Sequence, residues 1–334
     1  MRSMFPEPKL PTPLTRSDEL STGAVEVWIK NDGLSHPLYG GNKVRKAARL
    51  IAEAKRRGAR RVLTLGAVGS HHVLTTTLFA KAAGLRCAAV LIPQPSSEHV
   101  VDTIRASLGQ GLEAFCANHS ALAPLRIASA WRPGDVFVAP GGSNVTGALS
   151  YLEAVDELVE QLCAQDAPTP DWIIVPVGSG GTCAGIAAGV VKHRLKTRVL
   201  GVQVIPGAAP AWFATRLARA LLRRLLLPTR ELSRVLSFDA SEVGPGYGHA
   251  TQAGEAAIRT AQAAGLALDS TYTAKAFAAV LRQLGRAAQR NEPVRLLYWH
   301  TLSAVPLAPL LEGAPAAGDL PDAVERLLLA PRAP

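Results

Sequence analysis

Cysteine, aromatic residues and long apolar runs are all scarce in this chain of 334 residues. Its four cysteines (Cys87, Cys116, Cys163 and Cys183) are scattered, which excludes both a zinc-ligand cluster and a dense disulfide framework. No stretch reaches the ~18 uninterrupted apolar residues that cross a bilayer. The first 20 residues contain four prolines and no apolar core of signal-peptide length. We therefore expect a cytoplasmic protein that has no membrane partner.

Acidic residues are also few relative to basic ones, which gives a formal net charge of +10. Such a balance is typical of proteins that bind nucleic acids or anionic substrates. The densest basic run, "RLARALLRRLLLPTREL" at 216–232, places arginines among leucines at helical spacing. We interpret this run as the solvated face of an amphipathic helix and predict no nucleic-acid partner. A nucleic-acid or membrane surface is the alternative.

The chain does contain a repeated succession of short apolar strands, glycine-bearing turns and helix-length segments. A first series of predicted strands lies at 60–69, 86–93, 112–117 and 135–142. After a long helical segment, a second series lies at 172–181, 197–206, 233–238 and 294–300. Apolar strands that alternate with helices indicate parallel sheets covered on both faces. The sequence therefore predicts an α/β protein with two three-layer domains built on open, mostly parallel twisted sheets.

Two series of strands in a chain of this length indicate two domains. We expect a small α/β domain at 46–153 and a large α/β domain formed by 1–45 together with 154–334. In open parallel sheets, ligands bind beyond the carboxyl ends of the strands, where turns meet helix N-termini. The loops at those ends are therefore the candidate functional sites.

The loop with the clearest chemistry follows the predicted strand at 172–177. It consists of Gly178, Ser179, Gly180, Gly181 and Thr182, and a helix of small residues comes next. Unobstructed N–H groups at a helix start bind phosphate, and the two hydroxyls add donors. The loop lacks the third glycine of the dinucleotide fingerprint and the Gly-Lys-Ser/Thr ending of a P-loop. We predict a phosphate-binding loop, with a tight strand-to-helix turn as the alternative.

A second loop, "GAVGSHHVLTTT", places Ser70, His71 and His72 at the start of a predicted helix. The exposed N–H groups of such a start suit a carboxylate. Adjacent histidines point to different faces of a helix, and no third ligand has matching spacing, so we predict no metal site. An ordinary N-cap is the alternative for Ser70.

Four further residues stand at positions that suggest contact with a ligand. Tyr247 lies among glycines in "GPGYGHAT", Tyr272 precedes a predicted helix, and Thr301 follows the strand at 294–300. Lys43 comes directly after "YGGN", in the first turn of a helical segment. A lysine and a phosphate-binding loop are what pyridoxal phosphate requires, because the cofactor forms a Schiff base with an amine and anchors its phosphate separately. We interpret the two glycines before Lys43 as room for the planar ring.

In these features the sequence resembles the tryptophan-synthase-β-like, or fold type II, pyridoxal-phosphate enzymes. Within them it is most similar to the 1-aminocyclopropane-1-carboxylate deaminase/D-cysteine desulfhydrase family. The motifs that carry the resemblance occur in the family's order over nearly the whole chain: "LPTPL", "WIKNDGL", "GGNKVRK", "GGSNVTGALSYLEA", "VGSGGT", "GPGYG" and "YTAKA". The resemblance implies the fold type II architecture, bound pyridoxal 5'-phosphate and a homodimer.

The resemblance also implies roles for individual residues. Lys43 would be the Schiff-base lysine, residues 178–182 would bind the phosphate, and Thr301 would stand near the pyridine nitrogen. Asn42 would contact the ring, and His71 would lie near its phenolic oxygen. Residues 70–72 would hold the substrate carboxylate, with Ser70 near Cα. The following residues would line the substrate pocket: Tyr247, Tyr272 and Thr273. The resemblance also points to Asn144, in the "GGSN" motif, as a candidate site residue.

Four positions bear on the substrate. Thr273 matches the desulfhydrase-like members, whereas the deaminases that open a cyclopropane ring have glutamate after the tyrosine. The family's "QSNH" reads "GSHH" here, so His71 replaces an asparagine. The family's "HTGG" reads "HTLS", so Leu302 and Ser303 replace two glycines. Both departures alter the residues expected around the cofactor and the substrate.

We therefore predict a lyase or deaminase that eliminates a Cβ leaving group from a small amino acid and yields a keto acid and ammonia. Lys43 would act as the base at Cα, and a histidine of the "GSHH" segment would assist the leaving group. The alternatives are a 1-aminocyclopropane-1-carboxylate deaminase, another eliminase such as a cysteate sulfo-lyase, and a catalytically silent protein that binds pyridoxal phosphate.

Overall fold

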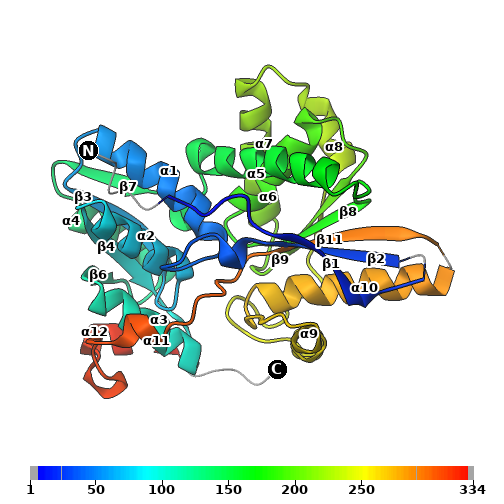
Figure 1. Ribbon diagram of the computed structural model, residues 1–334. Coiled ribbons are helices and arrows are strands. Elements are labelled where there is room, and N and C mark those ends of the chain that lie inside the picture. Colours follow the sequence, from blue (N-terminus) through cyan, green and yellow to red (C-terminus); the bar gives the residue numbers. More distant parts are fainter. Residues whose placement is uncertain (1–6, 24, 291, 330–334) are drawn as a thin grey trace. The chain divides into compact units, whose positions relative to one another are not determined.

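The chain divides into two compact units in a computed structural model that describes residues 7–23, 25–290 and 292–329 (Figure 1). Unit 1 contains residues 43–142 and 305–329, and unit 2 contains 9–42 and 143–304. The predicted small domain at 46–153 did not include the C-terminal segment. That segment belongs to unit 1 because strand β12 (Leu328–Leu329) pairs with β5 (Gln94–Pro95).

Unit 2 contains a six-stranded sheet in the order β1-β2-β11-β8-β9-β10. Its strands are β1 (Leu14–Thr22), β2 (Val25–Asn31), β8 (Trp172–Val177), β9 (Arg198–Gln203), β10 (Leu236–Asp239) and β11 (Val294–His300). Only β1 runs antiparallel to its neighbour; the other pairs are parallel. The second series of predicted strands forms β8 to β11. The N-terminal hairpin of β1 and β2 was not predicted as strands.

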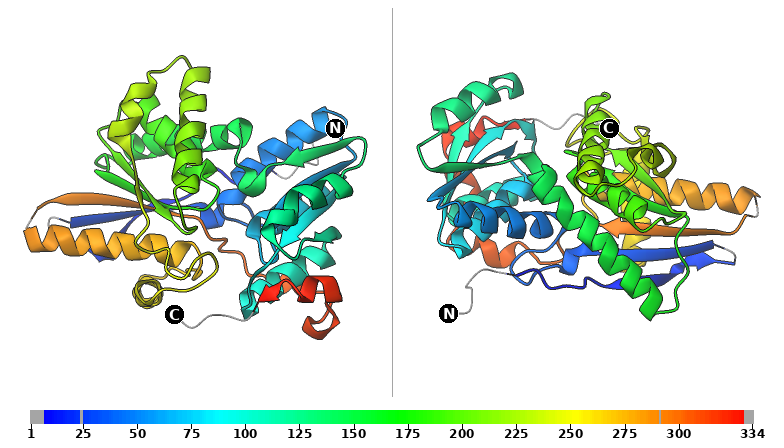
Figure 2. Two further views of the ribbon diagram at one scale, coloured as in Figure 1. Left: turned by 180° about the vertical axis from the view of Figure 1, so that it is seen from behind. Right: turned by 90° about the horizontal axis from the view of Figure 1, so that it is seen from above.

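Helices cover both faces of this sheet (Figures 1 and 2). The α-helices of unit 2 are α5 (Val145–Ala164), α6 (Gly181–Lys192), α7 (Ala209–Arg224), α8 (Leu232–Val235), α9 (Gln252–Ala263) and α10 (Thr273–Arg290). Its 3₁₀ turns are η1 (Asp32–Leu34) and η4 (Thr229–Glu231). One apolar core joins α5, α6 and α7 to one face, and a second core joins α9 and α10 to the other. The result is the predicted three-layer arrangement.

The basic run forms helix α7 and the turn that follows it. Leu217, Leu221 and Leu222 are buried against the sheet, while the arginines of the helix are exposed. This confirms the interpretation of the run as one face of an amphipathic helix. Within residues 7–23, 25–290 and 292–329, no helix combines the length and apolarity needed to cross a bilayer.

Unit 1 contains a fully parallel four-stranded sheet in the order β6-β4-β3-β7. Its strands are β3 (Arg61–Ala67), β4 (Arg86–Ile92), β6 (Leu112–Cys116) and β7 (Asp135–Val138). Its helices are α1 (Asn42–Arg56), α2 (His71–Ala82), α3 (Glu98–Gly109), α4 (Ala123–Ala130), α11 (Ala308–Leu311) and α12 (Asp322–Glu325), with 3₁₀ turns η2 (Ser120–Leu122), η3 (Pro140–Gly142) and η5 (Ala317–Asp319). The predicted first series of strands corresponds to this sheet.

A buried arginine joins the strand ends at one edge of the unit 1 sheet. Arg61, 1% exposed, donates to both carboxylate oxygens of Asp135 at 3.0 and 2.6 Å and to Glu113 at 2.7 Å. It also donates to the Ala130 carbonyl at 2.7 Å. Burial alone would raise the pKa of Asp135, but the hydrogen bond and charge of Arg61 outweigh it, so the pKa lies below its usual value.

We predict that Arg61→Ala lowers the free energy of unfolding at pH 7 by about 3–5 kcal/mol, because it leaves the Asp135 carboxylate buried without its cation. A carboxylate whose pKa is lower in the folded state than in the unfolded state stabilises the fold at pH values above its unfolded-state pKa. This stabilisation is lost as the pH falls through the folded-state pKa. The difference between variant and wild type should therefore shrink below pH ~4. Urea unfolding at several pH values measures both effects.

The matched control is Arg86→Ala, since Arg86 approaches the same Glu113 at 3.6 Å but is 62% exposed. Exposed ion pairs contribute about 0–1 kcal/mol. Two outcomes would contradict the stabilising role of the buried Arg61–Asp135 pair. One is an equal loss of unfolding free energy in the two variants, and the other is a loss for Arg61→Ala that does not change with pH.

Candidate active site

The predicted phosphate loop lies at the carboxyl end of β8, where helix α6 begins. Gly180 has a positive φ of 84° and precedes the helix, whose first turn contains no acidic residue. Ser143, which lies just before helix α5, supports the loop: its hydroxyl lies 2.7 Å from that of Ser179 and accepts a bond from the Gly181 N–H at 3.0 Å. A helix N-terminus with this composition attracts an anion through its N–H groups and its dipole.

Asn42, the residue before Lys43, is bonded directly to this loop. Its side-chain amide donates to the Thr182 hydroxyl at 3.0 Å. Its main-chain N–H donates to the Thr301 carbonyl at 3.1 Å, at the end of β11. Two of the predicted cofactor-binding segments are thus joined in unit 2 at the residue that leads into Lys43.

The glycines before Lys43 lie in close contact with neighbouring main-chain atoms. Gly41 has a φ of 91°, and a Cβ there would lie 2.8 Å from the Thr301 carbonyl oxygen and 3.1 Å from the Ser303 nitrogen. A Cβ on Gly40 would collide with the Gly33 carbonyl. Both residues therefore allow neighbouring backbone to approach closely, whereas the sequence suggested that they make room for a ring.

The carboxyl edge of the unit 2 sheet contains buried polar groups that have no protein partner. Among the described residues, the buried side-chain atoms without a hydrogen bond include His300 Nδ1 and Gln203 Oε1, at the ends of β11 and β9. Burial lowers the pKa of His300 to about 4, so its ring is neutral at pH 7. Thr301, 8% exposed, adds a neutral hydroxyl next to it. Unpaired neutral groups at the carboxyl end of the sheet, the end at which residues 178–182 also lie, are compatible with a bound heterocyclic phosphate such as pyridoxal phosphate.

The two predicted tyrosines meet each other. The Tyr272 hydroxyl donates to that of Tyr247 at 2.9 Å, and the rings form an edge-to-face pair 5.7 Å apart. The Tyr272 ring also lies against Gly178, where a Cβ would be 2.9 Å from Cε1. Removal from water raises the pKa of Tyr247 to about 12 and that of Tyr272 further, so both hydroxyls keep their protons at neutral pH.

Thr273 follows Tyr272 but turns away from solvent. It is fully buried, and its hydroxyl donates to the Asp269 carboxylate at 2.6 Å and accepts from the Asp269 N–H at 2.7 Å. Its side chain therefore fixes the loop before helix α10. Direct contact between Thr273 and a substrate remains a prediction.

In unit 1, residues 70–72 lie at the start of helix α2, as expected. Ser70 is the N-cap residue and its side chain makes no capping hydrogen bond. The His72 ring is buried, with Nε2 2.8 Å from the Thr64 hydroxyl. Burial lowers the pKa of His72 well below its usual value, and the charges of Lys43 and Lys46 lower it further. Lys43 is thus close enough to act electrostatically on this segment.

His71 contacts a residue that the sequence did not single out. Its Nε2 lies 3.0 Å from Nε2 of His99, in helix α3, with the ring centroids 4.9 Å apart. In a hydrogen bond of this kind one imidazole nitrogen donates its proton and the other accepts it. No third histidine, cysteine or carboxylate joins them into a metal-binding group in the part of the chain that the structure describes. No local pattern indicates His99, because the contact spans 28 positions of the chain.

Comparison with known proteins identifies the family. The profile of the family described as "Pyridoxal-phosphate dependent enzyme" matches residues 7–298. A D-cysteine desulfhydrase of Klebsiella pneumoniae subsp. pneumoniae is 32% identical over 307 residues, which are 87% of this chain and 91% of the relative. A D-cysteine desulfhydrase of Serratia proteamaculans is 32% identical over 308 residues, 87% of this chain and 90% of that protein.

Solved structures show the same architecture. An "ACC deaminase homologue" superposes with a TM-score of 0.72 at 26% identity, over 94% of this chain and 99% of the other. A fungal L-serine ammonia-lyase from Rhizomucor miehei has a TM-score of 0.64 at 20% identity, over 90% of this chain and 96% of the other, and shares the fold. The chain has the fold type II architecture of these enzymes and belongs to the pyridoxal-phosphate-dependent enzymes, in the 1-aminocyclopropane-1-carboxylate deaminase/D-cysteine desulfhydrase family.

Proposed function

We propose that this enzyme is an α,β-eliminating lyase whose substrate is D-cysteine or a similar small amino acid. The observation that carries the proposal is the bond from Asn42 to Thr182, because it ties the residue before Lys43 to the phosphate loop. A pyridoxal-phosphate enzyme needs its reactive amine and its phosphate site in this kind of fixed relation. The relatives named D-cysteine desulfhydrase support the substrate class.

The residues present would hold the cofactor as follows. Residues 178–182 would bind the phosphate, Lys43 would form the imine, and Thr301 would stand at the ring nitrogen. Asn42 and His71 would contact the ring. When bound, pyridoxal phosphate supplies a sink for the electron pair left on Cα after proton removal.

The chain's own groups would carry out the proton transfers. The N–H groups at residues 70–72 would orient the substrate carboxylate, and the Lys43 amine would take the Cα proton. The Cβ–S bond then breaks and sulfur leaves with the electron pair, which a histidine proton neutralises. Water converts the remaining enamine to pyruvate and ammonia, so all atoms of the substrate are accounted for.

Tyr247 and Tyr272 would act as neutral hydrogen-bond donors near the substrate. Their raised pKa values keep them protonated over the whole physiological range, so neither serves as a base there. This leaves Lys43 as the proposed base at Cα, with Ser70 as a hydroxyl near it.

A second candidate is deamination of 1-aminocyclopropane-1-carboxylate, favoured by the likeness to the deaminase homologue. The buried hydroxyl of Thr273 counts against it, because the position where the ring-opening members have glutamate is occupied here by a side chain bonded to Asp269. A cysteate sulfo-lyase and a silent binding protein are further outcomes of a substrate screen. Release of α-ketobutyrate from the cyclopropane substrate, without sulfide from D-cysteine, would favour the deaminase.

We further propose that the enzyme works in the cytoplasm as a homodimer. The cysteines are free thiols, and Cys87 and Cys183 are buried with pKa values raised by burial to about 12. Unreactive, unpaired thiols are suited to a reducing compartment. Gel filtration with light scattering tests the dimer.

We predict that Lys43→Ala abolishes the visible absorbance band of lysine-bound pyridoxal phosphate and lowers keto-acid release from D-cysteine by at least about 10²–10⁴-fold, because the base is lost. Absorbance spectra and a coupled lactate-dehydrogenase assay measure the two effects. A band retained in the variant would refute the assignment of Lys43. A normal band without turnover of D- or L-cysteine, cysteate, serine, chloroalanine or the cyclopropane substrate would refute the proposed activity.

We predict that Gly181→Ala weakens pyridoxal-phosphate binding by roughly 10-fold or more, which corresponds to the loss of about one charge-assisted hydrogen bond. The new Cβ would lie 2.5 Å from the Ser143 hydroxyl oxygen and displace it from the loop. The control is Gly285→Ala in α10, where nothing lies within 4 Å of the Cβ. Fluorescence titration of the apoenzyme measures both; equal affinities would contradict the role of the loop.

We predict that His71→Asn, which restores the family's residue, lowers kcat/KM for D-cysteine about 10²-fold while affecting β-chloro-D-alanine little. Chloride leaves without a proton, whereas sulfide gains one, so a proton donor matters only for the second. His99→Gln should shift the same ratio in the same direction. If both substrates lose equally, His71 serves binding and not protonation of the leaving group.

A further inference from the structure

The three residues before Lys43 have an unusually complete set of hydrogen bonds. The Gly40 N–H donates to the Ser303 hydroxyl at 3.0 Å, and the Gly41 N–H donates to the Asp32 carbonyl at 2.8 Å. The Gly41 carbonyl accepts from the Ser35 hydroxyl at 3.1 Å. The Asn42 N–H and side chain are bonded as described above. The Asn42 carbonyl oxygen lies 3.3 Å from the Tyr151 hydroxyl, which shares its single proton between this oxygen and a closer carboxylate. This segment is therefore held from several directions by unit 2.

Two of these contacts involve a single buried residue, Asp32. Asp32 is fully buried just after β2, and its side chain accepts three bonds: from Tyr151 at 2.5 Å, from the Trp299 indole N–H at 2.8 Å and from Thr12 at 3.0 Å. Its main-chain carbonyl meanwhile holds Gly41. One residue thus contacts the segment directly through its backbone and indirectly through Tyr151.

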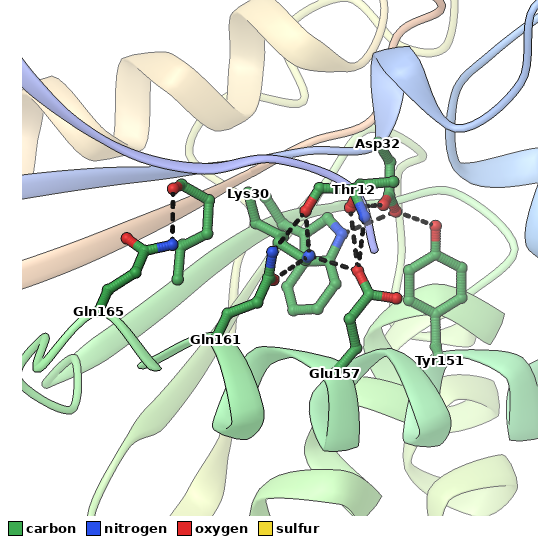
Figure 3. Close-up of polar contacts among 9 residues, drawn as sticks. Thr12, Lys30, Asp32, Tyr151, Glu157, Gln161 and Gln165 are labelled. Carbon is green, nitrogen blue, oxygen red and sulfur yellow. Dashed lines mark hydrogen bonds and ion pairs between the residues drawn. The ribbon is translucent and has the colours of Figure 1, made fainter. Parts of the chain in front are cut away.

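Tyr151 projects from helix α5 and is itself fixed by packing. It is fully buried, and its ring lies edge-on to that of Trp299, with centroids 5.9 Å apart. Figure 3 shows it pointing from the helix toward Asp32, beside a second polar group formed by Lys30, Glu157 and Gln161. The phenol's position is set by the Asp32 carboxylate and the Trp299 ring. Its oxygen, 3.3 Å from the Asn42 carbonyl oxygen, therefore restricts where that carbonyl lies.

We propose that Asp32 and Tyr151 are positioning residues for the reactive lysine: they fix the Asn42 carbonyl, and with it the peptide that leads into Lys43. The inference rests on the proposed role of Lys43. A carbonyl that shifts by an ångström changes the direction in which the next side chain leaves the helix, and misplacement of that size costs up to about 10²-fold in rate. Neither residue needs to touch the cofactor or the substrate.

The second polar group provides the internal control. Lys30 is fully buried and donates to Glu157, to the Gln161 side-chain oxygen at 2.5 Å and to the Thr12 carbonyl at 2.6 Å. Gln161 also donates to that carbonyl at 2.9 Å. Gln161 contributes to the same buried network, but among the described residues it makes no hydrogen bond to residues 40–42, so we expect its loss to affect stability and not the position of Lys43.

The test compares Tyr151→Phe with Gln161→Leu. The first keeps the ring packed on Trp299 and removes the hydroxyl; the second removes polar contacts of similar number elsewhere in the network. We expect Tyr151→Phe to slow imine formation between the apoenzyme and pyridoxal phosphate by roughly 10- to 100-fold, with kcat reduced and KM nearly unchanged. Amide hydrogen exchange in the peptide that covers residues 40–46 should rise in the apoenzyme. Gln161→Leu should lower Tm and leave these rates unchanged.

The outcomes separate this inference from the proposed function. If the wild type forms no imine, the proposed function has failed, and the exchange measurement still decides whether Tyr151 fixes the segment. If Tyr151→Phe forms the imine at the wild-type rate with unchanged exchange, the positioning role is refuted. Equal slowing by Gln161→Leu, at a temperature where both variants are folded, would also refute it. Asp32→Asn, which keeps the carbonyl that holds Gly41, should resemble Tyr151→Phe.

Discussion

The amide of Asn42 donates to the hydroxyl of Thr182 over 140 positions of the chain, and the arrangement of unit 2 is organised around that contact. Pyridoxal phosphate is a small rigid molecule, so its imine-forming amine and its phosphate site must be held at one spacing. Asn42 belongs to the loop that ends in Lys43, and Thr182 belongs to the phosphate loop. The parallel sheet makes the contact achievable because the carboxyl ends of β8 and β11 lie at the same edge.

Holding that contact requires polar groups in places where apolar residues would stabilise the fold better. Asp32, Lys30 and Tyr151 are fully buried, and a buried charge contributes little net stability even when it is well bonded. Well-packed apolar side chains of equal size are often neutral or stabilising in such positions. What Asp32 and Tyr151 add is direction, because each contacts one main-chain group of the segment before Lys43. The geometry of the site is thus maintained at the expense of stability in the core of unit 2.

Most of the fold, and the strand-to-helix turn at residues 178–182, could be predicted because their patterns are local. Short apolar strands alternate with helices, and the glycines of residues 178–182 mark a helix start. Strand β1 was missed because its buried positions recur every three residues rather than every two. The return of the C-terminal segment to unit 1 depends on a two-residue pairing. The turning of His72 and Thr273 toward buried partners likewise depends on contacts that the sequence does not display.

The departures from the family's pattern become informative once their partners are known. Ser303, where the family has glycine, accepts the bond from the Gly40 N–H and so adds an anchor to the segment before Lys43. His71, where the family has asparagine, meets His99 at hydrogen-bond distance. A pocket that had lost its function would have no reason to retain partners for its substituted residues, least of all a solvent-exposed partner such as His99. Both substitutions have instead acquired partners on separate elements. This compensation favours a working enzyme with altered leaving-group chemistry over a silent binding protein.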